Sequence, residues 1–333
     1  MTIFITGGTS SIGRVLIKEL SSKGETLKVL VRKNSNRQDL ELPGVSFVFG
    51  DVSEAKTVIE GMQGCDRVTH MAAIVGSNLP EAEWWRVNLE GSRTVLQAAR
   101  DQGVESMVMV SSLSVLGDTQ PGEIADETRP IDPAKYVNLY QKTKFAADQV
   151  AREFAVQGLP VKIVYPGFGF GCSFASSHPS LQEQTLLRMA AGKRVAIMGS
   201  GNNRLCLAYY KDTVAGISLA HSHGKAGEGY ILGNENLSFP ELWEVIAQVL
   251  GKSAPKGRIP LPLLRSVSLI SEKLSGKPIF PQDFFEMIGL NWCFSTRKAR
   301  EALGWQPLSF KQAMAETWAD YQRQGWTVNG TSR

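Results

Sequence analysis

The chain opens with Met1-Thr-Ile-Phe-Ile-Thr6, followed by Gly7-Gly-Thr-Ser-Ser-Ile-Gly13 and then Arg14-Val-Leu-Ile-Lys-Glu-Leu20. Residues 2–5 carry no charge and are mostly apolar or β-branched, which predicts a buried parallel strand. Residues 7–13 predict a tight turn, and residues 14–20 have helical periodicity. Strand, turn and helix in this order form the unit that binds a dinucleotide phosphate on the free N–H groups of the helix start. An ordinary βα turn is the simpler alternative, since the glycine spacing is imperfect.

Apolar runs separated by helical stretches continue through the first half of the chain. Further strands are expected at 27–31, 45–49, 66–71, 106–110, 161–165 and 229–233, with helices near 81–102 and from Tyr140 to about Gln157. Strands that alternate with helices at this pitch predict an α/β fold with a Rossmann-type, doubly wound parallel sheet.

The regular alternation weakens after Pro166, and the C-terminal part is mostly helical with frequent prolines. We expect residues 1–164 and 207–233 to form a dinucleotide-binding Rossmann domain. Residues 165–206 and 234–327 are expected to form a smaller, mostly helical substrate-binding lobe. Such a lobe would cover the carboxyl ends of the strands, where ligands bind in these sheets.

Composition limits the classes of function. The chain has 333 residues and a net charge of +4 that is spread without a basic block, so nucleic acid is not expected as a partner. No secretory leader precedes the first strand, and no apolar run approaches the ~20 residues of a membrane span. Four distant cysteines show no metal or redox spacing: Cys65, Cys172, Cys206 and Cys293. We expect a cytoplasmic protein without a metal site.

The segment Tyr140-Gln-Lys-Thr-Lys144 is the strongest candidate for chemistry, together with the pair Ser111-Ser112. Residues four apart on a helix share a face, so Tyr140 and Lys144 can reach one pocket. An ammonium near a phenol favours the phenolate, and a serine hydroxyl can hold an oxygen on which charge develops. The trio suits proton transfer to or from a carbonyl or alcohol oxygen. A solvated contact of the lysine stem with the ring is the commoner reason for this spacing, and the preceding dinucleotide unit favours catalysis.

Taken in order, these segments resemble an extended short-chain dehydrogenase/reductase of the NAD-dependent epimerase/dehydratase group. The resemblance covers nearly the whole chain and rests on Thr6–Gly13, Gly50-Asp51-Val52, His70-Met-Ala72-Ala73, Asn88-Leu-Glu-Gly-Ser92, Ser111–Gly117, Tyr140–Lys144, Tyr165–Gly171, Asp212 and Leu303–Pro307. Within the group, the chain is similar to dihydroflavonol-reductase-like and 3β-hydroxysteroid-dehydrogenase-like members. It also resembles bacterial proteins labelled hopanoid-associated sugar epimerases. The resemblance implies a homodimer, in which the helices at 83–102 and at Tyr140 pair with their copies.

The resemblance implies a role for each matching residue. Tyr140 would be the general acid or base, and Lys144 would bind the nicotinamide ribose and lower the tyrosine pKa. Ser112, rather than Ser111, would orient the substrate oxygen. Asn88 would position the helix behind the site, with an N-cap or a backbone hydrogen bond as the simpler role. Cofactor contacts are implied for the matching motif residues Gly7, Thr9, Ser10, Ser11, Ile12, Gly13, Asp51, Val52, Ala72, Ala73, Asn88, Pro166 and Gly169.

Two segments depart from the family pattern. Ser10 and Ser11 stand where extended and single-domain members, respectively, place glycine; this restricts backbone approach to the phosphates but offers two hydroxyl donors. Tyr165 stands where arginine is common, and the segment after it lacks the asparagine of many nucleotide-sugar enzymes. We expect a small to medium, largely apolar substrate rather than a nucleotide sugar.

The second predicted strand is followed by Arg32-Lys33, with Arg37 close behind. An acidic residue at this edge would bond the ribose 2′-hydroxyl of NAD, whereas an arginine accommodates the 2′-phosphate of NADP through its planar fork. NADP(H) is therefore the expected cofactor, with NAD possible. A solvated loop charge is the simpler alternative.

The leading interpretation is an NADPH-dependent reductase of a ketone or aldehyde, or the reverse alcohol dehydrogenase. A nucleotide-sugar epimerase or dehydratase with bound NAD is the alternative, and a non-catalytic cofactor-binding regulator is a third.

His221 and His223 are expected at a surface helix end, and His70 as a packed strand residue. The amphipathic run 261–274 is expected to pack on the core; roofing a substrate pocket or touching a membrane surface are the alternatives.

Overall fold

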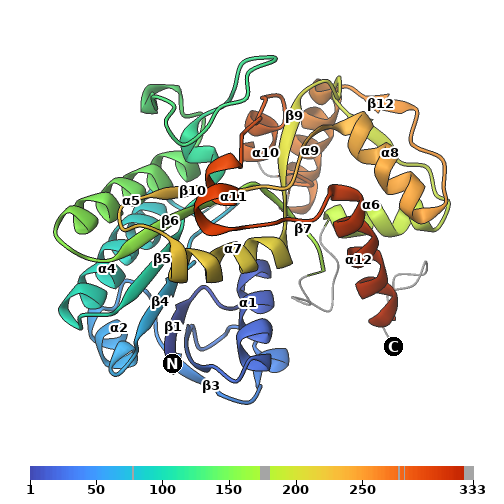
Figure 1. The fold of residues 1–333 in the computed structure, drawn as a ribbon. Coiled ribbons are helices and arrows are strands. Elements are labelled where there is room, and N and C mark those ends of the chain that lie inside the picture. Colours follow the sequence, from blue (N-terminus) through green and yellow to red (C-terminus); the bar gives the residue numbers. More distant parts are fainter. Residues whose placement is uncertain (77–78, 173–180, 277, 281, 326–333) are drawn as a thin grey trace.

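The main sheet of the protein has seven parallel strands (Figure 1). The computed structural model describes residues 1–76, 79–172, 181–276, 278–280 and 282–325. The strand order is β10 (Gly229–Leu232), β6 (Val161–Pro166), β5 (Ser106–Val110), β4 (Arg67–His70), β1 (Thr2–Thr6), β2 (Thr26–Val31) and β3 (Val45–Phe49). The strand order reverses between β1 and β4, which is where open α/β sheets bind ligands. The predicted doubly wound sheet is confirmed, including the return of residues 229–232 to it.

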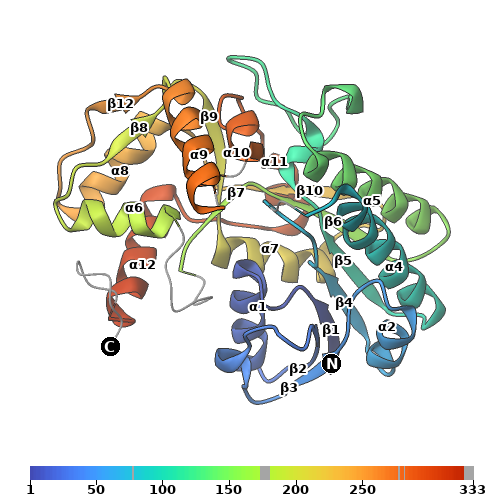
Figure 2. The ribbon, with the colours of Figure 1, turned by 180° about the vertical axis from the view of Figure 1, so that it is seen from behind.

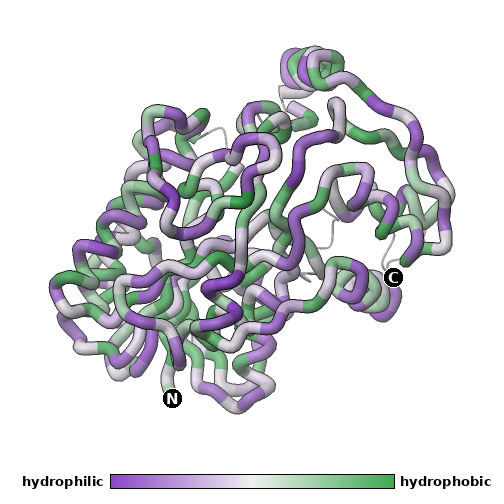
Figure 3. Tube along the Cα trace, turned by 45° about the horizontal axis from the view of Figure 1, so that its top comes forward, coloured by the Kyte–Doolittle hydropathy of each residue, from purple (hydrophilic) through white to green (hydrophobic). Residues whose placement is uncertain are grey.

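Helices cover both faces of this sheet (Figure 2). One face packs against α2 (Ala55–Met62), α4 (Gly91–Asp101) and α5 (Leu139–Val156), and the other against α1 (Ser11–Ser22), α7 (Tyr210–His223) and α11 (Arg297–Leu303). Alternate strand residues enter the two layers: Met107 and Met109 lie in the first, Val108 and Val110 in the second. Hydropathy alternates along the helices, as expected for elements with one face packed and one in solvent (Figure 3).

The helix expected near 81–102 is continuous but not regular. It consists of α3 (Glu81–Trp84), a π-helical stretch η2 (Trp85–Glu90) and then α4. π-Helical turns often mark functional sites, and Asn88 lies in this one. Short 3₁₀ turns occur at η1 (Gln38–Leu40), η3 (Leu113–Leu116) and η4 (Pro133–Lys135).

The remaining elements form a smaller lobe. It has a three-stranded sheet of β11 (Asn236–Ser238), β9 (Arg204–Tyr209) and β7 (Phe168–Phe170), and a two-stranded sheet of β12 (Gly257–Ile259) and β8 (Ala196–Met198). Its helices are α6 (Leu181–Ala190), α8 (Phe239–Leu250), α9 (Leu261–Ser275), α10 (Gln282–Met287) and α12 (Phe310–Arg323). The predicted boundary at residue 207 falls inside β9, and residues 173–180 and 326–327 of the predicted lobe lie outside the described residues. The division into two domains stays a prediction.

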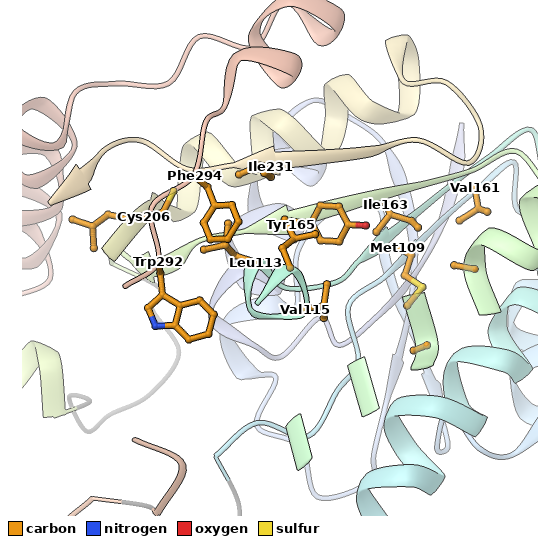
Figure 4. Close-up of a cluster of buried hydrophobic side chains, with 14 of the residues drawn as sticks. Met109, Leu113, Val115, Val161, Ile163, Tyr165, Cys206, Ile231, Trp292 and Phe294 are labelled. Atoms are coloured by element: carbon orange, nitrogen blue, oxygen red, sulfur yellow. The ribbon is translucent and has the colours of Figure 1, made fainter. Parts of the chain in front are cut away.

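The hydrophobic core continues from the main sheet into the lobe (Figure 4). Cys206, Trp292 and Phe294 belong to the same buried cluster as Leu113 and Tyr165. The segment after the serine pair is joined to the lobe by β-bridges between Thr119 and Asn291 and between Ala125 and Phe294. In the described part of the chain, no helix combines the length and the apolar character needed to cross a membrane.

Candidate active site

The turn between β1 and α1 has the geometry of a phosphate cradle. Gly7 has a φ of +72°, and a Cβ there would lie 2.6 Å from the backbone nitrogen of Ala72. A Cβ on Gly13 would lie 2.4 Å from the carbonyl oxygen of Gly7. Gly7 therefore allows the turn to pack tightly against the residues after β4, and Gly13 allows the start of α1 to pack against Gly7 and Gly8. Ser10 is the N-cap of α1, and its hydroxyl accepts a hydrogen bond from the Gly13 N–H at 3.1 Å.

Ser11, at the first position of α1, is hydrogen-bonded to the side chain of Tyr210 at the start of α7. Burial raises the pKa of the Tyr210 hydroxyl, so it stays protonated. Gly169 of β7 makes room for this tyrosine, because a Cβ there would lie 2.6 Å from its ring. Tyr210 thus contacts two predicted cofactor residues, Ser11 and Gly169. The sequence did not indicate Tyr210 as part of the site.

Arg14 is a second residue that the sequence analysis missed. Its side chain is only 2% exposed, although a charged residue directly after the glycine turn is expected at the surface. It donates to the carbonyl oxygen of Thr9 at 3.1 Å and forms an ion pair with Asp39. It also donates to the carbonyl oxygen of Asn36. Arg14 therefore fixes the phosphate turn to the loop after β2.

That loop places the predicted NADP-binding residues at the carboxyl edge of β2. Arg32 and Lys33 are exposed directly after the strand. The Arg37 guanidinium lies 4.9 Å from the ring centre of Phe49 and 5.5 Å from that of Phe47, both on β3. Three cations therefore lie on one loop, which Arg14 holds in place.

Asp51 follows β3 on the adenine side of the expected site. One oxygen, Oδ1, accepts hydrogen bonds from Ser53 and, at 3.1 Å, from Arg86 of η2. These hydrogen bonds lower the pKa of Asp51 although burial raises it, so the carboxylate is ionised. Val52 is buried against Gly91, where a Cβ would lie 2.6 Å from its side chain. This explains the glycine in the Asn88–Ser92 motif.

His70 is a packed strand residue, as predicted. Its ring nitrogens are hydrogen-bonded to the Thr6 and Ser92 hydroxyls, at 2.7 and 2.9 Å. Burial lowers the pKa of His70 to about 3, so the ring is neutral. Thr6 also accepts from the backbone N–H of Ala72 at 3.3 Å. The start of the Ala72-Ala73 segment is thereby held beside the phosphate turn.

Asn88 joins three parts of the site. Its Oδ1 accepts from the Ile74 N–H at 2.7 Å, and its Nδ2 donates to the Thr143 hydroxyl at 3.0 Å. Thr143 precedes Lys144 on α5. Asn88 therefore contacts the helix behind the site through Thr143, and it also forms the backbone hydrogen bonds that were the simpler alternative. Its positioning role stays a prediction.

Tyr140 and Ser112 are brought together. The Tyr140 hydroxyl is hydrogen-bonded to the Ser112 side chain, which is also bonded to the Ser114 hydroxyl at 2.9 Å. Burial raises the pKa of Tyr140, and the Ser112 bond offsets only part of this. Lys144 is not among the groups that shift this pKa here, so the expected lowering by Lys144 stays a prediction. Ser111 is buried, and its hydroxyl has no hydrogen-bond partner among the described residues.

Lys144 lies one turn after Tyr140 and is 2% exposed. Its Nζ donates to the carbonyl oxygen of Val110, at the end of β5, at 2.8 Å. Burial lowers the pKa of Lys144 to about 8, and the negative charge of Asp148 opposes this shift. Near neutral pH, the ammonium is protonated but close to its titration range.

Tyr165 has a different role from the one expected. Its side chain is fully buried in the layer under α5, where its hydroxyl donates to Asp148 at 2.8 Å and accepts from Arg152 at 2.6 Å. Arg152 also pairs with Asp148 at 2.9 Å. Tyr165 therefore gives no support to an apolar substrate, since its hydroxyl is engaged by α5 residues, and the substrate class stays a prediction. Arg152 supplies a guanidinium beside this strand position.

His221 lies at the end of α7, but it is buried rather than on the surface. Its ring nitrogens are hydrogen-bonded to Thr69 at 2.9 Å and to Ser106 at 3.0 Å, and burial lowers its pKa to about 3. The expected surface position is wrong for His221, because Thr69 of β4 and Ser106 of β5 cover its ring. Within the described residues, no group of His, Cys, Asp and Glu side chains could hold a metal ion.

Comparison with known proteins agrees with this geometry. A family model described as the NAD dependent epimerase/dehydratase family matches residues 3–233. The chain belongs to this family. Its fold is that of the extended short-chain dehydrogenases.

Members of the epimerase/dehydratase family that are similar to this chain include reductases and a sugar dehydratase. A Synechocystis sp. protein named for dihydroflavonol 4-reductase is 30% identical and covers 97% of this chain and 95% of its own. A 4-hydroxy-2-methyl-3-oxo-4-farnesyl-3,4-dihydroquinoline-1-oxide ketoreductase of Stigmatella aurantiaca is 28% identical, with 92% of each chain covered. The structure of a dTDP-glucose 4,6-dehydratase from Streptomyces venezuelae with NAD bound has a TM-score of 0.77 at 25% identity, covering 98% of this chain and 99% of that one.

Proposed function

We propose that this family member is an NADPH-dependent oxidoreductase that reduces a ketone or aldehyde, or oxidises the corresponding alcohol, of a small to medium, largely apolar substrate. The observation that carries the proposal is the hydrogen bond between Tyr140 and Ser112, with the Lys144 ammonium one turn further along α5. A bound nicotinamide cofactor supplies hydride chemistry. The protein supplies position and the proton.

Tyr140 would act as the general acid in the reductive direction. Because burial raises its pKa, Tyr140 keeps its proton at neutral pH and can give it to a carbonyl oxygen. Ser112 is already bonded to the same hydroxyl and would hold the substrate oxygen beside it. As the phenolate forms, the charge of Lys144 would stabilise it. In the oxidative direction, the same phenolate would take the proton back.

The residues around the turn fit a dinucleotide. The cradle between Gly7, Gly13 and β4 leaves no room for a Cβ, and α1 presents the free N–H groups of its first turn. The hydroxyls of Ser10 and Ser11 would donate to phosphate oxygens. All of the Asp51 hydrogen bonds to Ser53 and Arg86 use Oδ1, which leaves Oδ2 for an adenine amine.

The preference for NADP rests on charge at the β2 edge. Arg32 and Lys33 are exposed, and neither forms an ion pair with a described residue. A 2′-phosphate would satisfy both, whereas the 2′-hydroxyl of NAD needs an acidic partner, and Asp39 of this loop is already paired with Arg14 and Lys18.

A carbonyl substrate with a large apolar part is supported by the names of the similar proteins, since a dihydroflavonol and a farnesyl-bearing dihydroquinoline oxide are both ring ketones. Partly buried aromatic side chains follow β6, with Phe168 against Trp292 at 5.9 Å between ring centres.

We further propose a cytoplasmic homodimer formed through α4 and α5, which light scattering on the purified protein would test.

The deciding experiment follows NADPH consumption by the purified protein over flavonoid-like and steroid ketones, simple aldehydes and dTDP-sugars. We expect turnover of an apolar ketone and its loss, by roughly 10²–10⁴-fold, in Tyr140→Phe. NADPH binding by that variant, measured by fluorescence, should persist. Conversion of a dTDP-sugar without net NADPH consumption would instead favour the epimerase or dehydratase interpretation.

A further inference from the structure

Helix α9 presents a row of large apolar side chains to solvent. Leu263, Val267, Ile270 and Leu274 are 55%, 44%, 56% and 84% exposed. Their spacing of four, three and four residues places them on one side of the helix. We call these four residues the α9 stripe. The expected core packing of this run is wrong for the stripe.

The opposite side of α9 is fixed to the lobe. Ser268 is its one buried residue; its hydroxyl donates to the carbonyl oxygen of Phe280 at 2.9 Å and accepts from the Phe280 N–H at 3.0 Å. Phe280 in turn stacks on Phe284 at 4.6 Å between ring centres. Since this contact sets the rotation of the helix, the stripe faces away from the protein. α9 lies at the outside of the lobe (Figure 2).

Basic side chains without an ion-pair partner precede the stripe in the sequence and lie between its residues, and Arg265 lies beside Ser268 on the other side of α9. Residues 251–276 contain five basic side chains and one acidic side chain, Glu272. All five basic residues are exposed, and none forms an ion pair with a described residue: Lys252, Lys256, Arg258, Arg265 and Lys273. A binding partner with an apolar interior and a negatively charged surface would match both the apolar stripe and the unpaired basic residues.

We propose that the α9 stripe docks this protein on the surface of an anionic phospholipid bilayer. An amphipathic helix lies in the interface plane with its apolar side chains below the headgroups, and nearby lysine and arginine side chains bind anionic lipid. The four apolar residues of the stripe alone would bind a bilayer weakly. The basic residues would add affinity for anionic lipid, which makes the binding selective for it. A second copy of the chain fits less well, because pairing two stripes would bring two such basic segments together.

Vesicle flotation with the full-length protein tests this docking and does not depend on the proposed reaction. We expect binding to vesicles that contain phosphatidylglycerol, at least tenfold weaker binding to phosphatidylcholine alone, and release by high salt. Ile270→Glu should reduce the bound fraction at least tenfold. Ile124→Glu is the matched control, since Ile124 is 66% exposed outside α4, α5 and α9 and should leave binding unchanged.

Three results would overturn the proposal. One is wild-type protein that stays unbound with phosphatidylglycerol vesicles. Another is equal loss of binding in the two variants. The third is the absence of vesicle binding together with a dimer in light scattering that Ile270→Glu, but not Ile124→Glu, converts to monomer. This would assign the stripe to contact between copies. Since Ile270 is already exposed, equal unfolding midpoints of the two variants would exclude misfolding as the cause.

Discussion

The ammonium of Lys144 donates a hydrogen bond to the carbonyl oxygen of Val110 at 2.8 Å. This bond connects the helix that carries Tyr140 to the carboxyl end of strand β5. Burial of this charge lowers the pKa of Lys144, and the carboxylate of Asp148, one turn further along α5, raises it. The protonation of Lys144 is therefore set by two opposed influences, burial and a carboxylate.

The pH dependence of carbonyl reduction should report the titration of Lys144. Below its pKa of about 8, the ammonium is present and stabilises the phenolate that forms as Tyr140 gives up its proton. As pH rises through this value the charge is lost, so kcat for reduction should fall. Lys144→Met should be slower at neutral pH by roughly ten- to a thousandfold. Its pH profile should lack this decline; a decline that persists in Lys144→Met would show that another group causes it.

Asp148→Asn should shift this decline towards acid. The Asp148 charge raises the pKa of Lys144 against burial, so its removal should move the decline by about one pH unit. The amide oxygen can still accept from Tyr165, which keeps that part of the network. Tyr165→Phe is the matched control, since it breaks the same network but leaves the Asp148 charge. Equal shifts in both variants would mean that packing, not charge, sets the titration.

Arg32→Asp should weaken the preference for NADPH over NADH. Hydrogen bonds to a charged group contribute about 1.5–3 kcal/mol, so the ratio of the two kcat/KM values should fall roughly ten- to a hundredfold. Arg258→Asp makes the same charge reversal at an exposed residue of β12 and should leave the ratio unchanged. An unchanged ratio in Arg32→Asp would contradict the assignment of this edge to the 2′-phosphate.

Much of the fold could be predicted because its signals are local. Each predicted strand of the main sheet is a short apolar run, and burial on both faces makes such runs easy to recognise. The α9 stripe shows the limit of this reasoning. Periodicity identifies an apolar side of a helix, but it does not say whether protein or solvent covers that side. That depends on tertiary contacts such as Ser268 with Phe280.

The site was predictable where motifs matched, and less so where a side chain's direction mattered. Tyr165 alternates with Val161 and Ile163 in the layer under α5, and this period of two was readable from the strand. The spacing of four that links Tyr140 to Lys144 also continues to Asp148 and Arg152, so the network could have been found. The Tyr210 contact with Ser11 joins residues far apart in the chain, and no local pattern indicates it.

Gly7→Ala should destabilise the protein and abolish NADPH binding. Two effects act at this position. The φ of +72° strains any residue with a Cβ, and that Cβ would lie 2.6 Å from the backbone of both Met71 and Ala72. Backbone atoms cannot rotate away as a side-chain end can, so β4 and the turn would have to separate. Gly24→Ala separates the two effects, because Gly24 has a φ of +77° and a Cβ added there would meet nothing within 4 Å.

We therefore expect Gly24→Ala to lower the free energy of unfolding by about 1 kcal/mol through backbone strain alone, with NADPH affinity unchanged. Gly7→Ala should lower it by about 3 kcal/mol or more, because the clash adds to the same strain. Urea unfolding of both variants, with cofactor titration by fluorescence, measures each effect. If Gly7→Ala cost no more than Gly24→Ala and bound NADPH normally, the close approach of the turn to β4 would not be what holds the cradle in shape.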